Sequence, residues 1–200
     1  MDIKKKILKA LYPLIMRLSK SSAGKGKILE NSKKTLPAVP FYTLNTALSN
    51  GATLDFGQFK NKKVLLVNTA SNCGFTGQYE ELQQLHEQQK DSLVIVGFPA
   101  NDFQEQEKDD DATIAQFCQV NFGVTFPLAK KSVVVKKEDQ NAVYEWLTNT
   151  YKNGWNGHPP DWNFSKYLVN EQGVLTHYFG PAVSPVGEEI KTALRTSKTA

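Results

Sequence analysis

The strongest constraint on the fold of this chain is the stretch from Val64 to Tyr79, VLLVNTASNCGFTGQY. Its first four residues form an uninterrupted β-branched and aliphatic run, which is typical of a strand buried on both faces of a sheet. Small and polar residues follow, and beyond Tyr79 the side chains of Leu82 and Leu85 have helical spacing. The sequence therefore predicts a buried strand, a loop that contains Cys73, and a helix.

The position of Cys73 favours a reactive thiol. The N-terminus of a helix presents unpaired N–H groups and a partial positive charge, and both stabilise a thiolate. Since the thiolate is the nucleophilic form, we expect Cys73 to ionise more easily than a free cysteine. A buried structural cysteine is the alternative at this stage.

The charge of the chain is divided between two regions. Residues 1–34 hold ten Lys or Arg and two acidic residues, whereas the rest holds fourteen and eighteen. Residues 35–200 therefore carry a small net negative charge. This argues against nucleic-acid binding by that region, because a nucleic-acid-binding domain needs a basic face of its own. The length suggests one domain with an appendage, and no run of apolar residues is long enough for a membrane span. Two cysteines are too few for a disulfide framework.

The basic region predicts an amphipathic N-terminal arm. Its apolar side chains fall on one side of a helix and its basic ones on the other: Ile3, Ile7, Leu8, Leu11, Leu14, Ile15 and Leu18, against Lys5, Lys6, Lys9 and Arg17. Such a helix lies in a membrane interface or docks on a protein surface. We expect residues 1–20 to make this contact and residues 19–34 to form a polar linker. The domain proper is then residues 35–200.

The remaining elements predict an α/β architecture. Short strands are expected at 41–44 and 51–56 as an N-terminal hairpin, and a second buried strand at 93–98. A further extended segment is expected at 133–135, and strands at 167–169 and 174–179 should form a terminal hairpin. The helix after the loop of Cys73 is expected to extend to about residue 90, and further helices are expected at 112–120, 141–150 and 187–194. This order describes a sandwich with a central mixed sheet flanked by helices.

Several blocks of the sequence then resemble a known family. They are NTASNCGFT at 68–76, GFPANDF at 97–103, QE at 106–107, NFGVTFP at 121–127 and DWNFSKYLV at 161–169. In this order they are similar to the signature blocks of the glutathione peroxidase family, over about residues 40–194. The resemblance implies a thioredoxin-like three-layer fold. It also implies reduction of hydrogen peroxide and organic hydroperoxides by a selenocysteine or, as here, a cysteine.

The resemblance assigns roles to three residues. Cys73 matches the peroxidatic residue, and Trp162 and Asn163 match two further members of the catalytic tetrad. An indole N–H and an amide N–H₂ are hydrogen-bond donors that can stabilise a thiolate and a departing peroxide oxygen. A core aromatic residue is the alternative for Trp162.

The fourth tetrad position is less regular. The resemblance implies an amide side chain where this chain has Asp102. An ionised carboxylate near Cys73 would raise the pKa of the thiol by like-charge repulsion. Asp102 therefore turns away, is protonated, or leaves the amide to a neighbour such as Gln104. We expect Asp102 not to bond the thiolate directly.

Reduction of the oxidised enzyme needs a second thiol. Peroxide converts the Cys73 thiolate to a sulfenic acid, and Cys118 is the single internal candidate to resolve it. The alternative for Cys118 is a small apolar side chain on a helix face shared with Ile114 and Phe117. Thioredoxin or glutathione is the expected external reductant.

Other expectations concern the shape of the site, cofactors and location. The short segment between Trp146 and Trp162 is similar to that of monomeric family members with an open site, which would admit bulky hydroperoxides, including lipid ones. We expect no cofactor and no metal, a solvated loop at residues 106–111, and a cytoplasmic protein with peripheral membrane contact. Two other functions stay open: a thiol-disulfide oxidoreductase or peroxiredoxin, and a non-catalytic membrane- or partner-binding protein on this scaffold.

Overall fold

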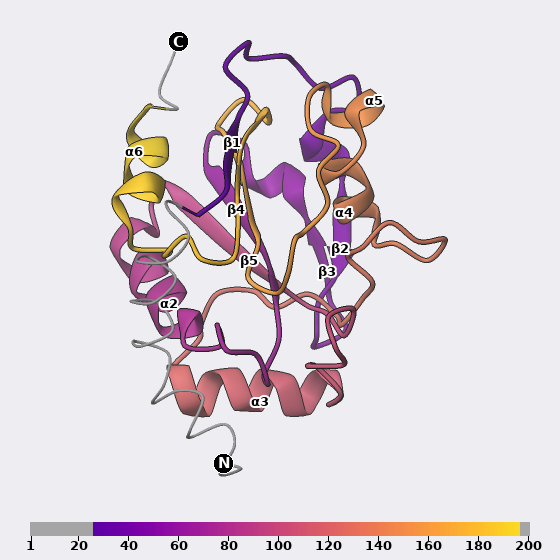
Figure 1. Cartoon of the computed structure of the whole chain (residues 1–200), viewed down its shortest axis with the longest axis vertical. Helices are drawn as coiled ribbons and strands as arrows, with labels where there is room; N and C mark the ends of the chain where they lie inside the picture. The colour runs from indigo at the N-terminus through magenta and orange to yellow at the C-terminus, as the bar shows by residue number, and fades with distance from the viewer. Residues whose placement is uncertain (1–25, 197–200) are drawn as a thin grey trace.

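A central five-stranded sheet organises the computed structural model, which describes residues 26–196 (Figure 1). The strand order is β1-β7-β6-β4-β5. The strands are β1 (Ile28–Glu30), β4 (Lys63–Thr69), β5 (Leu93–Pro99), β6 (Lys166–Val169) and β7 (Leu175–Phe179). A separate hairpin consists of β2 (Asn45–Ala47) and β3 (Thr53–Asp55).

Helices cover the two faces of the sheet and one of its ends. In Figure 1, α2 (Gln78–Gln89) and α6 (Glu188–Thr196) lie on one side of the sheet. The short helices α4 (Ala142–Leu147) and α5 (Thr150–Asn153) lie on the other side, near the hairpin, and α3 (Asp111–Phe122) crosses one end. The architecture is thus the predicted three-layer, thioredoxin-like sandwich.

The strand before Cys73 is the centre of this sheet. β4 pairs in parallel with β5 and antiparallel with β6, and every residue of β4 and β5 is buried. Alternate side chains of β4 enter two separate cores, as a strand covered on both faces requires. Leu65 and Val67 pack in the core beneath α2, α3 and α6, whereas Val64 and Leu66 pack in the core beneath α4.

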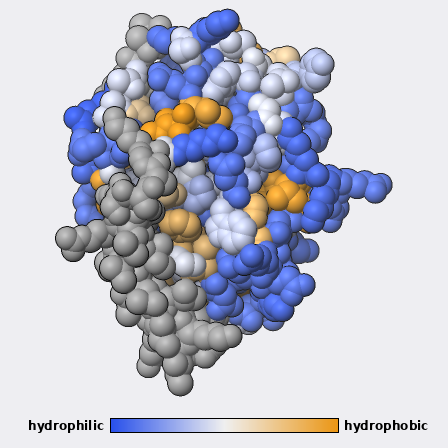
Figure 2. Space-filling view, in the orientation of Figure 1, coloured by the Kyte–Doolittle hydropathy of each residue, from blue (hydrophilic) through white to orange (hydrophobic). Residues whose placement is uncertain are grey.

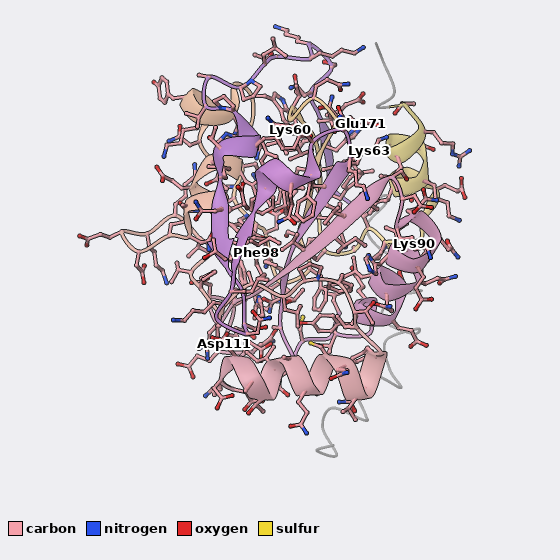
Figure 3. All side chains as sticks on the ribbon, turned by 180° about the vertical axis from the view of Figure 1, so that it is seen from behind. Lys60, Lys63, Lys90, Phe98, Asp111 and Glu171 are labelled. Carbon is pink, nitrogen blue, oxygen red and sulfur yellow. The ribbon has the colours of Figure 1, made fainter. Side chains whose placement is uncertain are left out.

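Lys63 and Asp111 lie at opposite ends of the sheet. In Figure 3, Lys63 at the start of β4 lies beside Glu171, and their Nζ and Oε1 atoms are 2.5 Å apart. Asp111, the first residue of α3, lies at the other end, toward which β5 runs through Phe98. The carboxyl ends of the two parallel strands therefore point toward α3.

Several local predictions were wrong. Residues Phe41–Thr43 form a 3₁₀ turn, so the first hairpin strand is β2 instead. Val133 makes a single β-bridge with Gln140 rather than a strand. The predicted helix at 141–150 stops at Leu147, where Thr148 caps it. Each segment is too short for its composition alone to decide its backbone conformation.

The predicted linker also contains structure. Strand β1 lies within residues 19–34 and pairs antiparallel with β7, with Ile28 opposite Phe179. The sheet therefore includes residues that we had expected to precede the domain. The predicted arm at residues 1–20 lies outside the described residues.

In Figure 2, the visible surface of the described residues is mainly hydrophilic and carries separate apolar areas. Among residues 26–196, no helix combines the length and the hydrophobicity that crossing a bilayer requires.

A buried lysine secures the loop after β7. Lys166 is fully buried, and its Nζ donates to the carbonyl oxygens of Val183 at 2.6 Å and Pro181 at 3.3 Å. Burial lowers the pKa of Lys166 from 10.5 to about 7, while the carboxylate of Glu81 acts in the opposite direction.

This shift predicts how stability depends on pH. Below pH 7 the lysine is protonated in both states, but between pH 7 and 10.5 only the unfolded chain keeps the proton. The free energy of unfolding should therefore rise with pH above 7, by up to about 1.4 kcal/mol per pH unit from this group. Urea denaturation of the wild type and Lys166→Met at several pH values should show a difference that changes with pH. With Lys191→Met, a surface control, the difference should stay constant, and a constant difference for Lys166→Met would contradict this account.

Candidate active site

Cys73 lies in a tight loop between β4 and α2. Its side chain is 1% exposed. The backbone N–H of Cys73 donates to Thr76 Oγ1 at 3.0 Å, and that hydroxyl donates to the carbonyl oxygen of Ala70 at 2.9 Å. The N–H of Phe75 donates to the Cys73 sulfur at 3.4 Å. The loop therefore fixes the thiol just before the first turn of α2, as the sequence predicts.

Pairing of β4 with β6 brings Trp162 and Asn163 to this thiol. Asn68, near the end of β4, bonds the loop that precedes β6 in two places: its Nδ2 donates to the carbonyl oxygen of Trp162 at 3.0 Å, and its carbonyl accepts from the N–H of Phe164 at 2.6 Å. Phe164 has a left-handed φ of 66°, which is strained for an aromatic residue. These bonds hold the turn in a conformation that a free loop would rarely adopt.

The turn directs two donors at the sulfur. The side chains of Trp162 and Asn163 lower the pKa of the Cys73 thiol, as do the backbone N–H groups of Phe75 and Gly74, and Trp162 packs against the core cluster that contains Cys73. The ring of Trp162 also packs on Phe103, with ring centroids 5.4 Å apart. The three residues that the sequence assigned to the site are therefore adjacent in the structure.

The ionisation of Cys73 differs from the prediction. Burial raises the pKa of the thiol, and this effect exceeds the combined lowering by its four hydrogen-bond donors. The expectation of an easily ionised thiol considered the helix N-terminus and not the loss of hydration. The donors therefore offset part of the cost that burial adds to ionisation of Cys73.

Gln106 is a site residue that the sequence analysis missed. Its Oε1 accepts from Asn163 Nδ2 at 2.9 Å, and its backbone carbonyl accepts from the N–H of Asn72 at 3.1 Å. An amide nitrogen has two N–H bonds, so the bond to Gln106 uses one and leaves the other available to Cys73. The QE pair was visible in the motif, but the charged residues after it favoured a solvated loop.

Neither Asp102 nor Gln104 takes the place of this amide. The carboxylate of Asp102 accepts from the N–H of Val134 at 2.8 Å and lies 3.4 Å from the Nζ of Lys137. It thus turns away from Cys73, which was the first of the three alternatives. Gln104 is exposed and has a left-handed backbone, with φ of 51°.

The prediction of a solvated loop at residues 106–111 was wrong for its first two residues. Glu107 is fully buried, and its Oε2 accepts from the hydroxyl of Ser71 at 2.9 Å. Its backbone N–H donates to Asn101 Oδ1 at 2.9 Å. Residues 106 and 107 therefore connect the loop of Cys73 to Asn163, and Glu107 is withdrawn from water.

Cys118 lies in α3 and is fully buried. It belongs to the same apolar core as Cys73, with Ile114 and Phe117, and both cysteines are present as thiols. This position fits the small apolar residue of the alternative prediction. It also places the second thiol in a helix that packs beneath the loop of the first.

Comparison with known proteins agrees with this geometry. The glutathione peroxidase family model matches residues 41–148, which include Cys73, Gln106 and Cys118. The chain belongs to the glutathione peroxidase family. It is 39% identical to a glutathione peroxidase of Lactococcus lactis, with 77% of this chain and 99% of that protein aligned. It is 42% identical to the glutathione peroxidase-like peroxiredoxin HYR1 of Saccharomyces cerevisiae, with 78% and 96% aligned.

Solved structures give the same assignment for the fold. The structure of T. cruzi GPX1 superposes with a TM-score of 0.59 at 27% identity, over 78% of this chain and 94% of that one. A DsbF homologue of Corynebacterium diphtheriae superposes with a TM-score of 0.60 at 16% identity, over 88% and 96%. The latter shares only the thioredoxin-like fold with this glutathione peroxidase family member.

Replacement of Trp162 by Phe tests the donor geometry. The variant keeps an aromatic ring against Phe103 but loses the indole N–H, so the pKa of Cys73 should rise further. We expect the single-turnover rate with hydrogen peroxide at pH 7 to fall by about 10²-fold and its pH profile to move to higher pH. Trp155→Phe, in the other core, is the matched control. A Trp162→Phe rate within about twofold of the wild type would show that the indole does not act on the sulfur.

Proposed function

We propose that this chain is a thiol-dependent peroxidase that reduces hydrogen peroxide and organic hydroperoxides through Cys73, in defence against oxidative stress. The observation that carries the proposal is that the loop before β6 brings the side chains of Trp162 and Asn163 to Cys73, where both lower the pKa of the thiol. A structural cysteine in an apolar core has no use for two polar side-chain donors, and the Asn163 amide had to be buried to reach it.

The first step oxidises Cys73. Its sulfur attacks one peroxide oxygen, the O–O bond breaks, and the other oxygen leaves as water or an alcohol. Because burial keeps the thiol pKa high, the thiol proton leaves as the sulfur attacks and goes to the departing oxygen. Trp162 and Asn163 stabilise the negative charge that develops on sulfur and oxygen, and neither competes for the proton. The product is a Cys73 sulfenic acid.

The second step restores the thiol. In the proposed cycle, Cys118 attacks the sulfenic acid and gives a Cys73–Cys118 disulfide, which thioredoxin reduces. Cys118 is fully buried within α3, so the helix must open locally for the two sulfurs to meet. The competing route keeps the sulfenic acid until glutathione or another small thiol reduces it. The names of relatives such as the S. cerevisiae glutathione peroxidase-like peroxiredoxins favour a peroxiredoxin-like cycle.

Two thiol variants separate these routes. We expect Cys73→Ser to lose peroxidase activity with either reductant. Cys118→Ser should form the sulfenic acid normally but lose most of its activity with thioredoxin. Peroxide consumption and mass spectrometry after one equivalent of peroxide measure both effects. Full activity of Cys73→Ser would show that Cys73 is not the reacting thiol, and a wild type without peroxidase activity would make the non-catalytic binding protein the better assignment. A lasting sulfenic acid in the wild type would favour the one-cysteine cycle.

The remaining proposals concern assembly and location. We propose a cytoplasmic monomer with an open site for bulky hydroperoxides, including lipid ones. The support is the short segment from residue 147 to residue 161, which contains only the four-residue helix α5. The aromatic side chains of Phe75, Phe103 and Trp162 near Cys73 are partly exposed and offer an apolar approach for such substrates.

Membrane contact through residues 1–20 would place lipid substrates near the site. The support is the segregation of basic and apolar side chains along the arm. In liposome flotation with anionic vesicles, the full chain should float and a chain that begins at residue 26 should not. Charge-neutral vesicles serve as the control. Equal recovery of both chains in the soluble fraction would contradict this role of the arm.

A further inference from the structure

The hydroxyl of Tyr178 contacts two residues that lie on either side of the turn at Trp162–Phe164. It donates to Asp161 Oδ2 at 2.8 Å and accepts from the backbone N–H of the same residue at 3.2 Å. It also lies 3.3 Å from Ser165 Oγ. Asp161 precedes the turn and Ser165 follows it, so one hydroxyl connects the two ends of the turn.

The sheet brings this hydroxyl to the turn. β7 pairs antiparallel with β6, and Tyr178 lies opposite Tyr167, near the start of β6. Tyr178 is fully buried, and its ring packs against that of Tyr167 with centroids 5.1 Å apart. Strand pairing and ring packing therefore fix the position of the hydroxyl beside the loop that precedes β6.

Ser165 extends this support to Trp162. Ser165 is fully buried, and its hydroxyl donates to the carbonyl oxygen of Trp162 at 2.9 Å. The same carbonyl accepts from Asn68 Nδ2 at 3.0 Å. The ring of Trp162 packs on Phe103 and against the core cluster that contains Cys73. The backbone of Trp162 is thus held from β4 and, through Ser165, from β7, and this backbone determines where the indole lies.

Asp161 is also held on its second carboxylate oxygen. His158 Nε2 lies 3.0 Å from Asp161 Oδ1, and Lys27 Nζ lies 3.7 Å from the same oxygen. The His158 ring packs edge-on against Tyr178, with centroids 4.7 Å apart. Burial raises the pKa of Asp161, but the bonds from Tyr178 and His158 and the charge of Lys27 together lower it below the ordinary value. Asp161 is therefore an ionised acceptor for the tyrosine hydroxyl at pH 7.

We propose that Tyr178 is a positioning residue of the peroxidase site, and that its hydroxyl holds the Trp162 indole in the place from which it acts on Cys73. This inference rests on the proposed peroxidase function. The turn contains Phe164, whose left-handed φ of 66° is unfavourable for an aromatic residue. Bonds from outside the turn are therefore needed to keep its conformation, and the hydroxyl of Tyr178 supplies them from β7.

The neighbouring Asn163 amide has separate support, because its Nδ2 donates to Gln106 Oε1 at 2.9 Å. Loss of the Tyr178 hydroxyl should therefore act on the indole of Trp162 rather than on this amide. A misplacement of about 1 Å at a reacting group can cost about 10²-fold in rate. We expect a smaller effect, of about tenfold, since Asn68 still holds the Trp162 carbonyl.

Tyr178→Phe tests this role because it removes the hydroxyl and keeps the buried ring. The rate at which one equivalent of hydrogen peroxide oxidises Cys73, measured by stopped flow, should fall by about tenfold at pH 7. Tyr144→Phe is the matched control. Tyr144 is also fully buried, and its hydroxyl makes no hydrogen bond to the residues that the structure describes. The rate of this control should stay within about twofold of the wild type.

A double-mutant cycle shows whether Tyr178 acts through the indole. If it does, Tyr178→Phe should have no further effect on the rate in a Trp162→Phe background. In an Asn163→Ala background it should still lower the rate by about tenfold. General loosening of the fold would lower the rate by the same factor in the Trp162→Phe background as in the wild type, and this result would overturn the proposal.

Two variants of Asp161 test the same connection without a change in the core. Asp161→Asn keeps an oxygen that accepts from the Tyr178 hydroxyl, whereas Asp161→Ala removes it. Both lose the carboxylate charge, so a difference between them reports on the hydrogen bond. We expect a fall of about tenfold for Asp161→Ala and a rate within about threefold of the wild type for Asp161→Asn. Equal rates for these two variants would refute the role of the bond, even if Tyr178→Phe did not fold.

The outcomes distinguish this inference from the proposed function. If wild-type protein forms the Cys73 sulfenic acid and Tyr178→Phe forms it at the wild-type rate, the positioning role is refuted and the peroxidase function stands. If the wild type does not react with peroxide, the proposed function fails, and the positioning role of Tyr178 fails with it.

Discussion

The pairing of β4 with β6 is the constraint on which the rest of the site depends. Cys73 follows one of these strands and Trp162 and Asn163 precede the other, so antiparallel pairing brings their loops to the same end of the sheet. Asn68 then bonds the second loop through its side chain and its backbone. The left-handed backbone of Phe164 shows that packing and these bonds, rather than local preference, determine the loop.

Within this frame, two opposing effects determine the reactivity of Cys73. Burial removes the thiol from water and raises its pKa, while donors from two segments lower it. A buried thiol is protected from adventitious oxidation, and donors already in position need no reorganisation when charge develops. The site thus stabilises the transition state of the attack more than the resting thiolate. Gln106 contributes because it orients the Asn163 amide rather than because it contacts the sulfur in the described bonds.

The sequence was informative where the pattern is long or specific. The VLLV run predicted the buried central strand, and the ordered motifs predicted Cys73, Trp162 and Asn163 as site residues. It was misleading for Phe41–Thr43 and for the linker that contains Ile28, because short segments obtain their conformation from tertiary pairing. Glu107 was assigned to solvent from its charged neighbours, and only the folded structure shows that Ser71 and the core enclose it. The net ionisation of Cys73 also depends on burial, which spacing along the chain does not reveal.

A titration of the Cys73 thiol tests the central claim most directly. In a Cys118→Ser background a single thiol remains, and its thiolate absorbance can be followed against pH with and without Asn163→Ala. The account predicts a pKa above that of an ordinary cysteine in the parent, and a further rise when the Asn163 amide is removed. A pKa well below the ordinary value, or one that does not respond to the loss of Asn163, would contradict the claim that burial dominates and that donors from the loop before β6 act on this sulfur.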